Sequence, residues 1–236
     1  MAATPTPPPP SPGTPVGRRV VLGMLGLGVA GIALGRRASD AVGGALAGTP
    51  VGAVLPGAGG FRFYSVVGSV PEVAPADYRL EVTGLVSRPT TFTMADLAAL
   101  PQTSFTRDVQ CVTGWRVDDV AWSGVLLRDL LTAAGAREDA GVLLRSFDGG
   151  YTESLTAEQA RRDDVLVATT MQGTPVSHDH GGPVRLVVAP MYFYKSLKWL
   201  GGVEVAAAPP PGYWEVRGYD VDAWVGRSNG RDDAPV

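Results

Sequence analysis

From about residue 61 onward, the chain consists of short segments in which apolar and polar residues alternate, and this pattern restricts the fold more than any other feature. Between residues 78 and 84, Tyr78, Leu80 and Val82 alternate with polar residues, which predicts a half-buried β-strand. A chain of such strands must fold around sheets. Further strands are predicted at residues 104–112, 141–147, 164–170, 183–189 and 202–208.

Two short helices are predicted from capping boxes between these strands. Residues 93–100 begin with Thr93, and Asp96 stands at the third helical position, where its carboxylate can bond back to the cap. Thr156 and Gln159 have the same spacing. Both helices are therefore expected to be brief connections between strands.

The longest predicted helix spans residues 123–135, with Ser123 as its N-cap and leucines at helical spacing. Strands and helices do not alternate as in a parallel βαβ fold, and no internal repeat appears. The sequence therefore predicts one strand-rich α+β domain over residues 61–208, followed by an aromatic-rich C-terminal tail, residues 209–236, that docks on its surface.

An apolar run at residues 20–35 has an arginine pair on each side. As a helix it would span about 24 Å, less than the roughly 30 Å of a hydrocarbon core. The twin arginine, the modest apolar run and the small residues at 45–47 resemble a twin-arginine export signal. An uncleaved, short membrane anchor is the alternative.

The N-terminal part is accordingly divided into a disordered start plus export segment, residues 1–47, and a linker, residues 48–60. The domain is expected to work outside the cytoplasm, on the periplasmic side or at the cell surface. The formal net charge is −3, and the export segment carries four of the arginines but only one acid, so the remainder is more acidic. This balance argues against nucleic-acid binding.

Cys111 is the only cysteine, which excludes an intrachain disulfide and Cys-rich zinc or iron–sulfur sites. A buried structural thiol is one interpretation. The other is a thiolate nucleophile or metal ligand, because Cys111 ends a predicted strand before a glycine turn. Arg107 and Arg116 would supply positive potential for that thiolate.

Three other segments could carry chemistry. "HGGPVRL" is a glycine turn followed by Arg185, and it could hold an anion. "YKSLKWL" contains both lysines of the chain, Lys195 and Lys198, whose spacing predicts one ammonium cluster suited to phosphate. In "DGGYTES", Asp148 and Tyr151 lie on a glycine turn, and Tyr151 could donate a hydrogen bond to a substrate. Each segment could equally be an ordinary turn.

Together, "VQCVTGW…AWSGVLLRDLL", "HGGPVRLVVAP" and "KSLKWLGGVEV" resemble the molybdopterin-binding domain of sulfite-oxidase-fold enzymes. That family includes sulfite oxidases, plant-type nitrate reductases and a periplasmic methionine sulfoxide reductase. The resemblance implies a mixed-sheet domain that binds the molybdenum cofactor (Mo-molybdopterin) and transfers an oxygen atom to or from a sulfoxide or another small sulfur compound. It further implies an external electron-transfer partner, such as a membrane haem protein.

The resemblance also implies roles for individual residues. Cys111 corresponds to the molybdenum ligand, and Tyr151 to the active-site tyrosine near the substrate. The residues that correspond to cofactor contacts are Tyr64, Ser146, Asp148, His180, Arg185, Ser196, Leu197 and Lys198.

The chain departs from the family in several respects. The methionine sulfoxide reductase has an Asn where this chain has His180, and a Tyr-Glu pair where this chain has Tyr64-Ser65. The Arg-Asn-His segment of sulfite oxidases is replaced by "YSVVGSVPEV", which removes an arginine for an anionic substrate and makes sulfite a weaker expectation. Only 28 residues follow residue 208, so the immunoglobulin-like dimerisation domain is expected to be absent and the chain to be a monomer.

Two alternatives belong to other classes. Cys111, His178 and His180 could form a three-ligand zinc site of a hydrolase, although the two histidines lie far from the cysteine along the chain. A binding module that keeps the fold without a cofactor is the other alternative.

Overall fold

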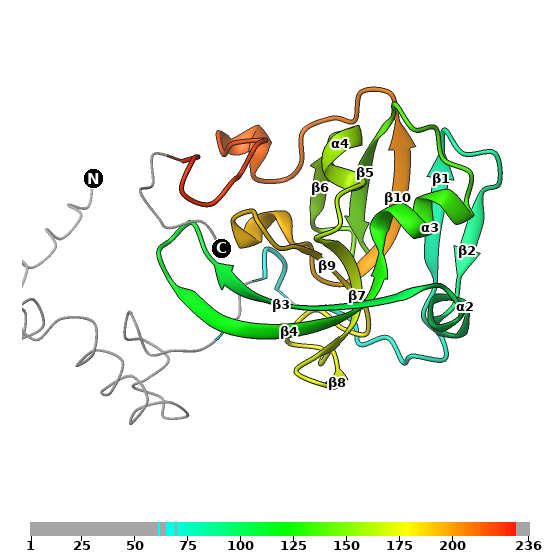
Figure 1. Ribbon diagram of the computed structural model, residues 1–236, viewed down its shortest axis with the longest axis horizontal. Helices are drawn as coiled ribbons and strands as arrows, with labels where there is room; N and C mark the ends of the chain where they lie inside the picture. Colours follow the sequence, from blue (N-terminus) through cyan, green and yellow to red (C-terminus); the bar gives the residue numbers. More distant parts are fainter. Residues whose placement is uncertain (1–60, 62–64, 69, 230–236) are drawn as a thin grey trace, which may run out of the picture. The chain divides into compact units, whose positions relative to one another are not determined.

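A computed structural model of the chain describes residues 61, 65–68 and 70–229 (Figure 1). The predicted export segment, the linker and Tyr64 lie outside the described residues. Among the helices that the structure describes, none combines the length and the apolar character needed to cross a membrane.

One sheet of the described chain has five strands in the order β2-β1-β10-β5-β6. β1 runs parallel to β10, whereas the other neighbours are antiparallel, so the sheet is mixed. The alternation predicted for residues 78–84 is confirmed, because Tyr78, Leu80 and Val82 are buried and the residues between them are exposed, although β1 itself begins at Leu80. The strands are β1 (Leu80–Gly84), β2 (Thr90–Phe92), β5 (Gly141–Ser146), β6 (Thr152–Leu155) and β10 (Leu200–Ala206).

The other sheet is antiparallel, with the order β3-β4-β7-β8 and with β9 paired to β7. Figure 1 shows β3 and β4 as a long, curved hairpin. Its register shifts between Arg107 and Val109, and this bulge interrupts the regular alternation predicted for residues 104–112. The strands are β3 (Gln102–Gln110), β4 (Arg116–Leu126), β7 (Val165–Met171), β8 (Thr174–Pro175) and β9 (Arg185–Val188).

The helices are short. Both predicted capping boxes are confirmed, since Thr93 and Asp96 bond reciprocally at the start of α2, as do Thr156 and Gln159 at α4. The helices are α2 (Met94–Ala99), α3 (Leu127–Ala133) and α4 (Ala157–Ala160), with the 3₁₀ turns η2 (Phe193–Lys195) and η3 (Glu215–Arg217).

The helix predicted over residues 123–135 is wrong in its first part. Residues 123–126 belong to β4, where they pair with β3 on one side and with β7 on the other. Helix α3 therefore begins at Leu127, and its N-cap is Leu126 without a side-chain cap, not Ser123. Pairing on both edges outweighs the helical spacing of the leucines.

The two sheets share one hydrophobic core. Leu80 and Val203 from one sheet cluster with Val167 and Leu186 from the other, together with the buried leucines of α3. A second cluster lies around Trp122 of β4, and Phe61, Trp115 and Phe193 pack against it. This second cluster adjoins the cavity described below.

The C-terminal segment, defined here as residues 209–229, packs against the domain at both of its ends. The Tyr213 N–H donates to the carbonyl of Thr152 in β6 at 2.9 Å. Farther along, the Tyr192 N–H donates to the Ala223 carbonyl at 2.8 Å, and Ala223 and Val225 are buried in the shared core. The segment thus runs along η2 and returns to the core (Figure 1).

Candidate functional site

A cavity of about 590 Å³ brings together most of the residues predicted from the sequence motifs. They come from four separate parts of the chain: the end of β3, the turn after β5, the turn before β9, and the segment between η2 and β10. The predicted residues that line the cavity are Cys111, Asp148, Tyr151, His180, Arg185, Ser196, Leu197 and Lys198.

Cys111 lies immediately after β3, in the turn that connects the β3–β4 hairpin. Its N–H donates to the Trp115 carbonyl and its carbonyl accepts from the Gly114 N–H, both at 2.9 Å. The thiol is half-buried, and its sulfur lies 3.2 Å from the Thr113 hydroxyl. The turn therefore presents a thiol to the cavity on a backbone fixed by two hydrogen bonds.

The two arginines expected to favour a thiolate do not form a positive cluster around Cys111. Arg116 pairs with Asp108 and with Asp118, so its charge is compensated by two carboxylates. Arg107 is exposed and lies over the ring of Phe105. The prediction that these arginines create the local potential is wrong, because the acidic residues of the same hairpin pair with Arg116.

Arg185 supplies a buried positive charge to the cavity. Its guanidinium donates to the His180 carbonyl at 2.6 Å and to the Ser196 carbonyl at 2.9 Å. It also lies over the rings of Phe193 and Trp122. Within the described residues no carboxylate pairs with Arg185. Burial lowers the pKa of Arg185 to about 9, so the group stays charged at neutral pH.

His180 and Lys198 line the cavity beside this buried charge. Burial, followed by the charge of Arg185, lowers the pKa of His180 and lowers the pKa of Lys198 to about 8. The His180 Nδ1 lies 2.8 Å from the Ser177 hydroxyl. Gly181 follows His180 directly and has a φ of 97°. A Cβ added at Gly181 would lie 2.6 Å from the Lys198 side chain. The backbone and Lys198 can pack this closely because residue 181 is glycine.

The two lysines do not form the predicted ammonium cluster. Lys195 is completely buried, does not line the cavity, and pairs with Glu153 and Glu215. Only Lys198 lines the cavity. Helical spacing does not apply here, because η2 ends at Lys195 and the chain then becomes irregular.

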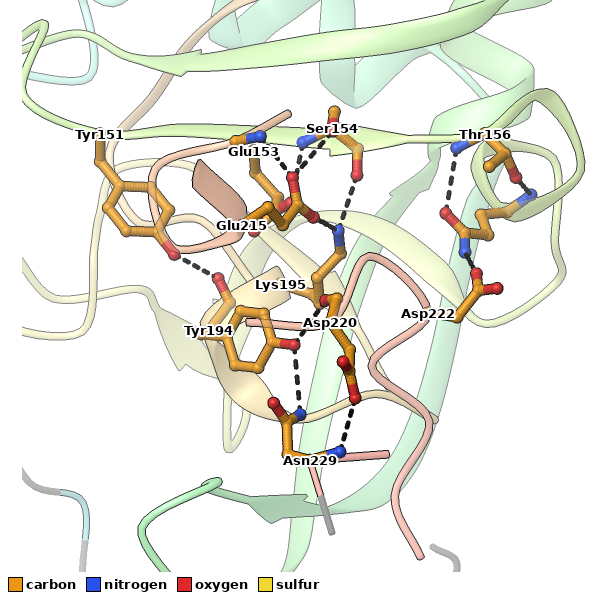
Figure 2. A network of polar contacts seen from close by, with 12 residues as sticks. Tyr151, Glu153, Ser154, Thr156, Tyr194, Lys195, Glu215, Asp220, Asp222 and Asn229 are labelled. Atoms are coloured by element: carbon orange, nitrogen blue, oxygen red, sulfur yellow. Dashed lines mark hydrogen bonds and ion pairs between the residues drawn. The ribbon is translucent and has the colours of Figure 1, made fainter. Parts of the chain in front are cut away.

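Figure 2 shows Lys195 between β6 and the C-terminal segment. Its ammonium donates to the Glu153 carboxylate at 2.6 Å and to the Ser154 carbonyl at 2.8 Å, and it also bonds to Glu215. Burial and the charge of Glu215 raise the pKa of Glu153 to about 8, despite the opposing effect of Lys195. One ammonium thus joins two segments that are distant in sequence.

Asp148 and Tyr151 lie on the turn between β5 and β6. The Ser146 hydroxyl bonds to Asp148, whose carboxylate also accepts from the Gly150 N–H at 3.0 Å. Ser146 itself is buried beneath this turn and supports Asp148 without lining the cavity. The Tyr151 hydroxyl donates to the Tyr194 carbonyl at 2.6 Å (Figure 2), so its proton is engaged with the backbone, unlike the expected free donor.

Sequence reasoning missed most of the aromatic lining of the cavity. These residues are Phe61, Trp115, Phe193, Tyr194, Trp199, Trp214 and Tyr219. Trp214 and Tyr219 come from the C-terminal segment, which the sequence indicated only as an aromatic tail. One sequence signal could have suggested that these two residues pack against the domain: several aromatic residues follow directly after a proline run.

The donors of the cavity fit a cofactor that carries both a soft metal and an anionic group. The Cys111 thiol is a soft ligand, and the buried Arg185 guanidinium has the geometry to bind phosphate. The zinc alternative is not supported, because the described part of the chain contains no group of three or more His, Cys, Asp or Glu side chains able to hold a metal. His178 instead packs on Trp199.

The chain matches the family described as "Oxidoreductase molybdopterin binding domain" over residues 67–214. The oxidoreductase YuiH of Bacillus subtilis is 36% identical over 149 residues, 62% of this chain and 75% of its own. A chain of Azospira oryzae named as the protein-methionine-sulfoxide reductase subunit YedZ1 is 32% identical over 168 residues, 71% of this chain and 63% of its own.

Among solved structures, the sulfane dehydrogenase SoxCD of Paracoccus pantotrophus is similar, with a TM-score of 0.55 and 27% identity. The match covers 58% of this chain and 40% of that one, so it concerns part of the larger protein. These similarities confirm the predicted fold, a mixed, strand-rich α+β domain, and the predicted cofactor class. The chain belongs to the molybdopterin-binding oxidoreductase family, and its cofactor is the molybdenum cofactor.

Proposed function

We propose that this chain is an extracytoplasmic oxidoreductase that uses the molybdenum cofactor to move an oxygen atom to or from a small sulfur compound. One observation carries the proposal: the Cys111 thiol and the buried Arg185 guanidinium, which has no carboxylate partner in the part of the chain that the structure describes, face the same cavity. When bound, the cofactor supplies two-electron oxygen-atom-transfer chemistry.

The residues of the cavity divide this work. Arg185, His180 and Lys198 hold the anionic part of the pterin, because Arg185 and Lys198 carry positive charge and the His180 ring can donate a hydrogen bond. Cys111 is the protein's metal ligand. Its thiolate is one soft donor, which suffices because the pterin brings its own sulfurs.

The other predicted residues orient and shield the site. Ser196 fixes the segment before Lys198, since its hydroxyl accepts from the Val188 N–H at 2.9 Å and its carbonyl accepts from Arg185. Asp148 is held by Ser146 beside the cavity, in position to accept a hydrogen bond from the pterin. Tyr151 covers the substrate side, and its phenol oxygen can still accept one hydrogen bond.

The location and the electron partner are part of the proposal. The arginine-flanked apolar run and the small-residue site support export in a folded state. The substrate's two electrons must come from or go to a second protein, and a membrane haem protein is the proposed partner.

The test is expression of the full chain in a host that makes the cofactor and in an otherwise identical strain that cannot. We expect molybdenum in about equimolar amount and a fluorescent pterin after oxidation only in the first case. Sulfite and methionine sulfoxide are the first two substrates to screen. Protein without molybdenum and pterin contradicts the proposal and favours a binding module; bound zinc favours the hydrolase.

A further inference from the structure

The C-terminal segment supplies part of the cavity wall. Trp214 and Tyr219 line the cavity together with Tyr151 and Tyr194, and we call these four residues the aromatic wall. The rings of Trp214 and Tyr219 have centroids 5.0 Å apart, and the rings of Tyr219 and Tyr194 are edge-to-face at 5.3 Å. Tyr151 stacks on Tyr213, the residue before Trp214, at 5.3 Å. The wall is thus one continuous aromatic cluster.

The aromatic wall is fixed in place by the buried charges beside it. Glu215, directly after Trp214, bonds to Lys195, to the Gly212 N–H and to the Ser154 hydroxyl. Lys195 in turn follows Tyr194 directly. Each of these two wall residues is therefore adjacent to a member of the same buried ion pair, which makes the wall part of the fold and not a loose flap.

The positive charges of the cavity belong to a different group of residues. Arg185 lies over Phe193 and Trp122, and Lys198 lies over the ring of Trp199. In the proposed function these cations hold the cofactor.

The chemistry of the aromatic wall disfavours an anion. The faces of its four rings carry partial negative charge and offer no cation to pair with an anion such as sulfite. An unpaired charge that is buried against such a surface costs free energy. Burial of apolar groups against the four rings instead favours binding.

The geometry points to Trp214 and Tyr219 as specificity-determining residues that select an uncharged sulfoxide with an apolar substituent over an inorganic sulfur oxyanion. This inference rests on the proposed function, because it assigns a substrate class to that site. In the reaction the sulfur–oxygen bond breaks, and two electrons and two protons convert the oxygen to water and leave the sulfide. The protons come from solvent and the electrons from a one-electron donor, in two steps.

The experiment measures turnover of methyl phenyl sulfoxide, dimethyl sulfoxide and sulfite by the metal-loaded protein. Reduced methyl viologen is the electron donor for the two sulfoxides. A one-electron dye is the electron acceptor for sulfite. In Trp214→Leu and Tyr219→Leu, we expect kcat/KM for methyl phenyl sulfoxide to fall about tenfold, and that for dimethyl sulfoxide to change less than about twofold. The matched control is Trp224→Leu. This indole packs under Arg162, away from the cavity lining, and its removal should leave the ratio of the two kcat/KM values unchanged.

Binding gives a readout that needs no turnover. The dissociation constant of methyl phenyl sulfone, measured by calorimetry, should rise about tenfold in Trp214→Leu and less than about twofold in Trp224→Leu. Three results would overturn the inference. The variants could lose kcat/KM equally for both sulfoxides, they could lose it for neither, or the wild type could turn over sulfite efficiently. If no sulfur compound is turned over but sulfone binding still depends on Trp214, the proposed reaction fails while the apolar selection stands.

Discussion

Lys195 donates a hydrogen bond of 2.6 Å to Glu153, and neither side chain exposes any surface to solvent. Glu215 of the C-terminal segment bonds to the same ammonium. A single positive charge thus holds together β6, η2 and the C-terminal segment. Tyr194 and Trp214 line the cavity and directly precede Lys195 and Glu215, so this buried charge cluster fixes the backbone next to two cavity residues without lining the cavity itself.

Replacing Lys195 by Met should strongly destabilise the protein, because it leaves two buried carboxyl groups without their cation. We expect a loss of roughly 3–5 kcal/mol in the free energy of unfolding, measured by urea denaturation. The control is the triple variant Lys195→Met, Glu153→Gln, Glu215→Gln, which removes the ammonium together with both ionisable carboxyl groups and should recover much of the loss. A single variant as stable as the wild type contradicts this account.

Glu153 should make stability fall as the pH rises. Its pKa is raised from 4.5 to about 8 in the folded state, so the folded protein binds the proton more tightly than the unfolded chain. This contribution is fully present below the unfolded pKa and is lost as the pH rises through about 8. Urea denaturation between about pH 5 and pH 8 should show the decline, and Glu153→Gln should flatten it. An unchanged slope in Glu153→Gln would show that another group causes the decline.

Much of the fold could be predicted from local patterns. The buried positions of β1 and the two capping boxes depend on nearby residues, and the structure confirms them. The error at residues 123–126 has the opposite origin. Leucine spacing indicates a helix there, but β3 and β7 pair with this stretch from both sides, and neither neighbour is visible in a local pattern.

The candidate site could be predicted only in part for the same reason. The motifs around Cys111 and Arg185 indicated soft-metal and anion chemistry, and the structure brings both to one cavity. The environment of Lys195 could not be read from its spacing to Lys198, because its partners lie 42 and 20 residues away in sequence. Trp214 reaches the cavity because the C-terminal segment packs against the domain. The composition of that segment does not predict how it packs.

Gly181→Ala should reduce cofactor retention. The new Cβ would lie 2.6 Å from the Lys198 side chain, so Lys198 must move away from the predicted phosphate position. Gly149→Ala is a matched control, because Gly149 also has a positive φ, of 72°, but has open space around its Cβ position. Molybdenum per protein, measured by elemental analysis, should fall in the first variant and stay near the wild-type value in the second. Equal occupancy in both variants contradicts the role of this turn.

Arg185→Lys should lower molybdenum occupancy although the charge is kept. A lysine cannot reproduce the two hydrogen bonds to the His180 and Ser196 carbonyls while facing an anion. The comparison is Arg162→Lys, where the arginine pairs with Asp164 near the surface. We expect a loss of about 1–3 kcal/mol in cofactor binding for Arg185→Lys alone, followed as pterin retained after dialysis. Similar retention in both variants would contradict a cofactor role for Arg185.

The most direct test of the account is the number of sulfur ligands on molybdenum, measured by X-ray absorption on the metal-loaded protein and on Cys111→Ser. Thr113→Val is the control, since it removes the hydroxyl 3.2 Å from the Cys111 sulfur and keeps the thiol. We predict that Cys111→Ser loses one sulfur ligand and its turnover, whereas Thr113→Val keeps the wild-type ligand number. An unchanged sulfur count with retained turnover in Cys111→Ser would contradict the assignment of Cys111 as the metal ligand.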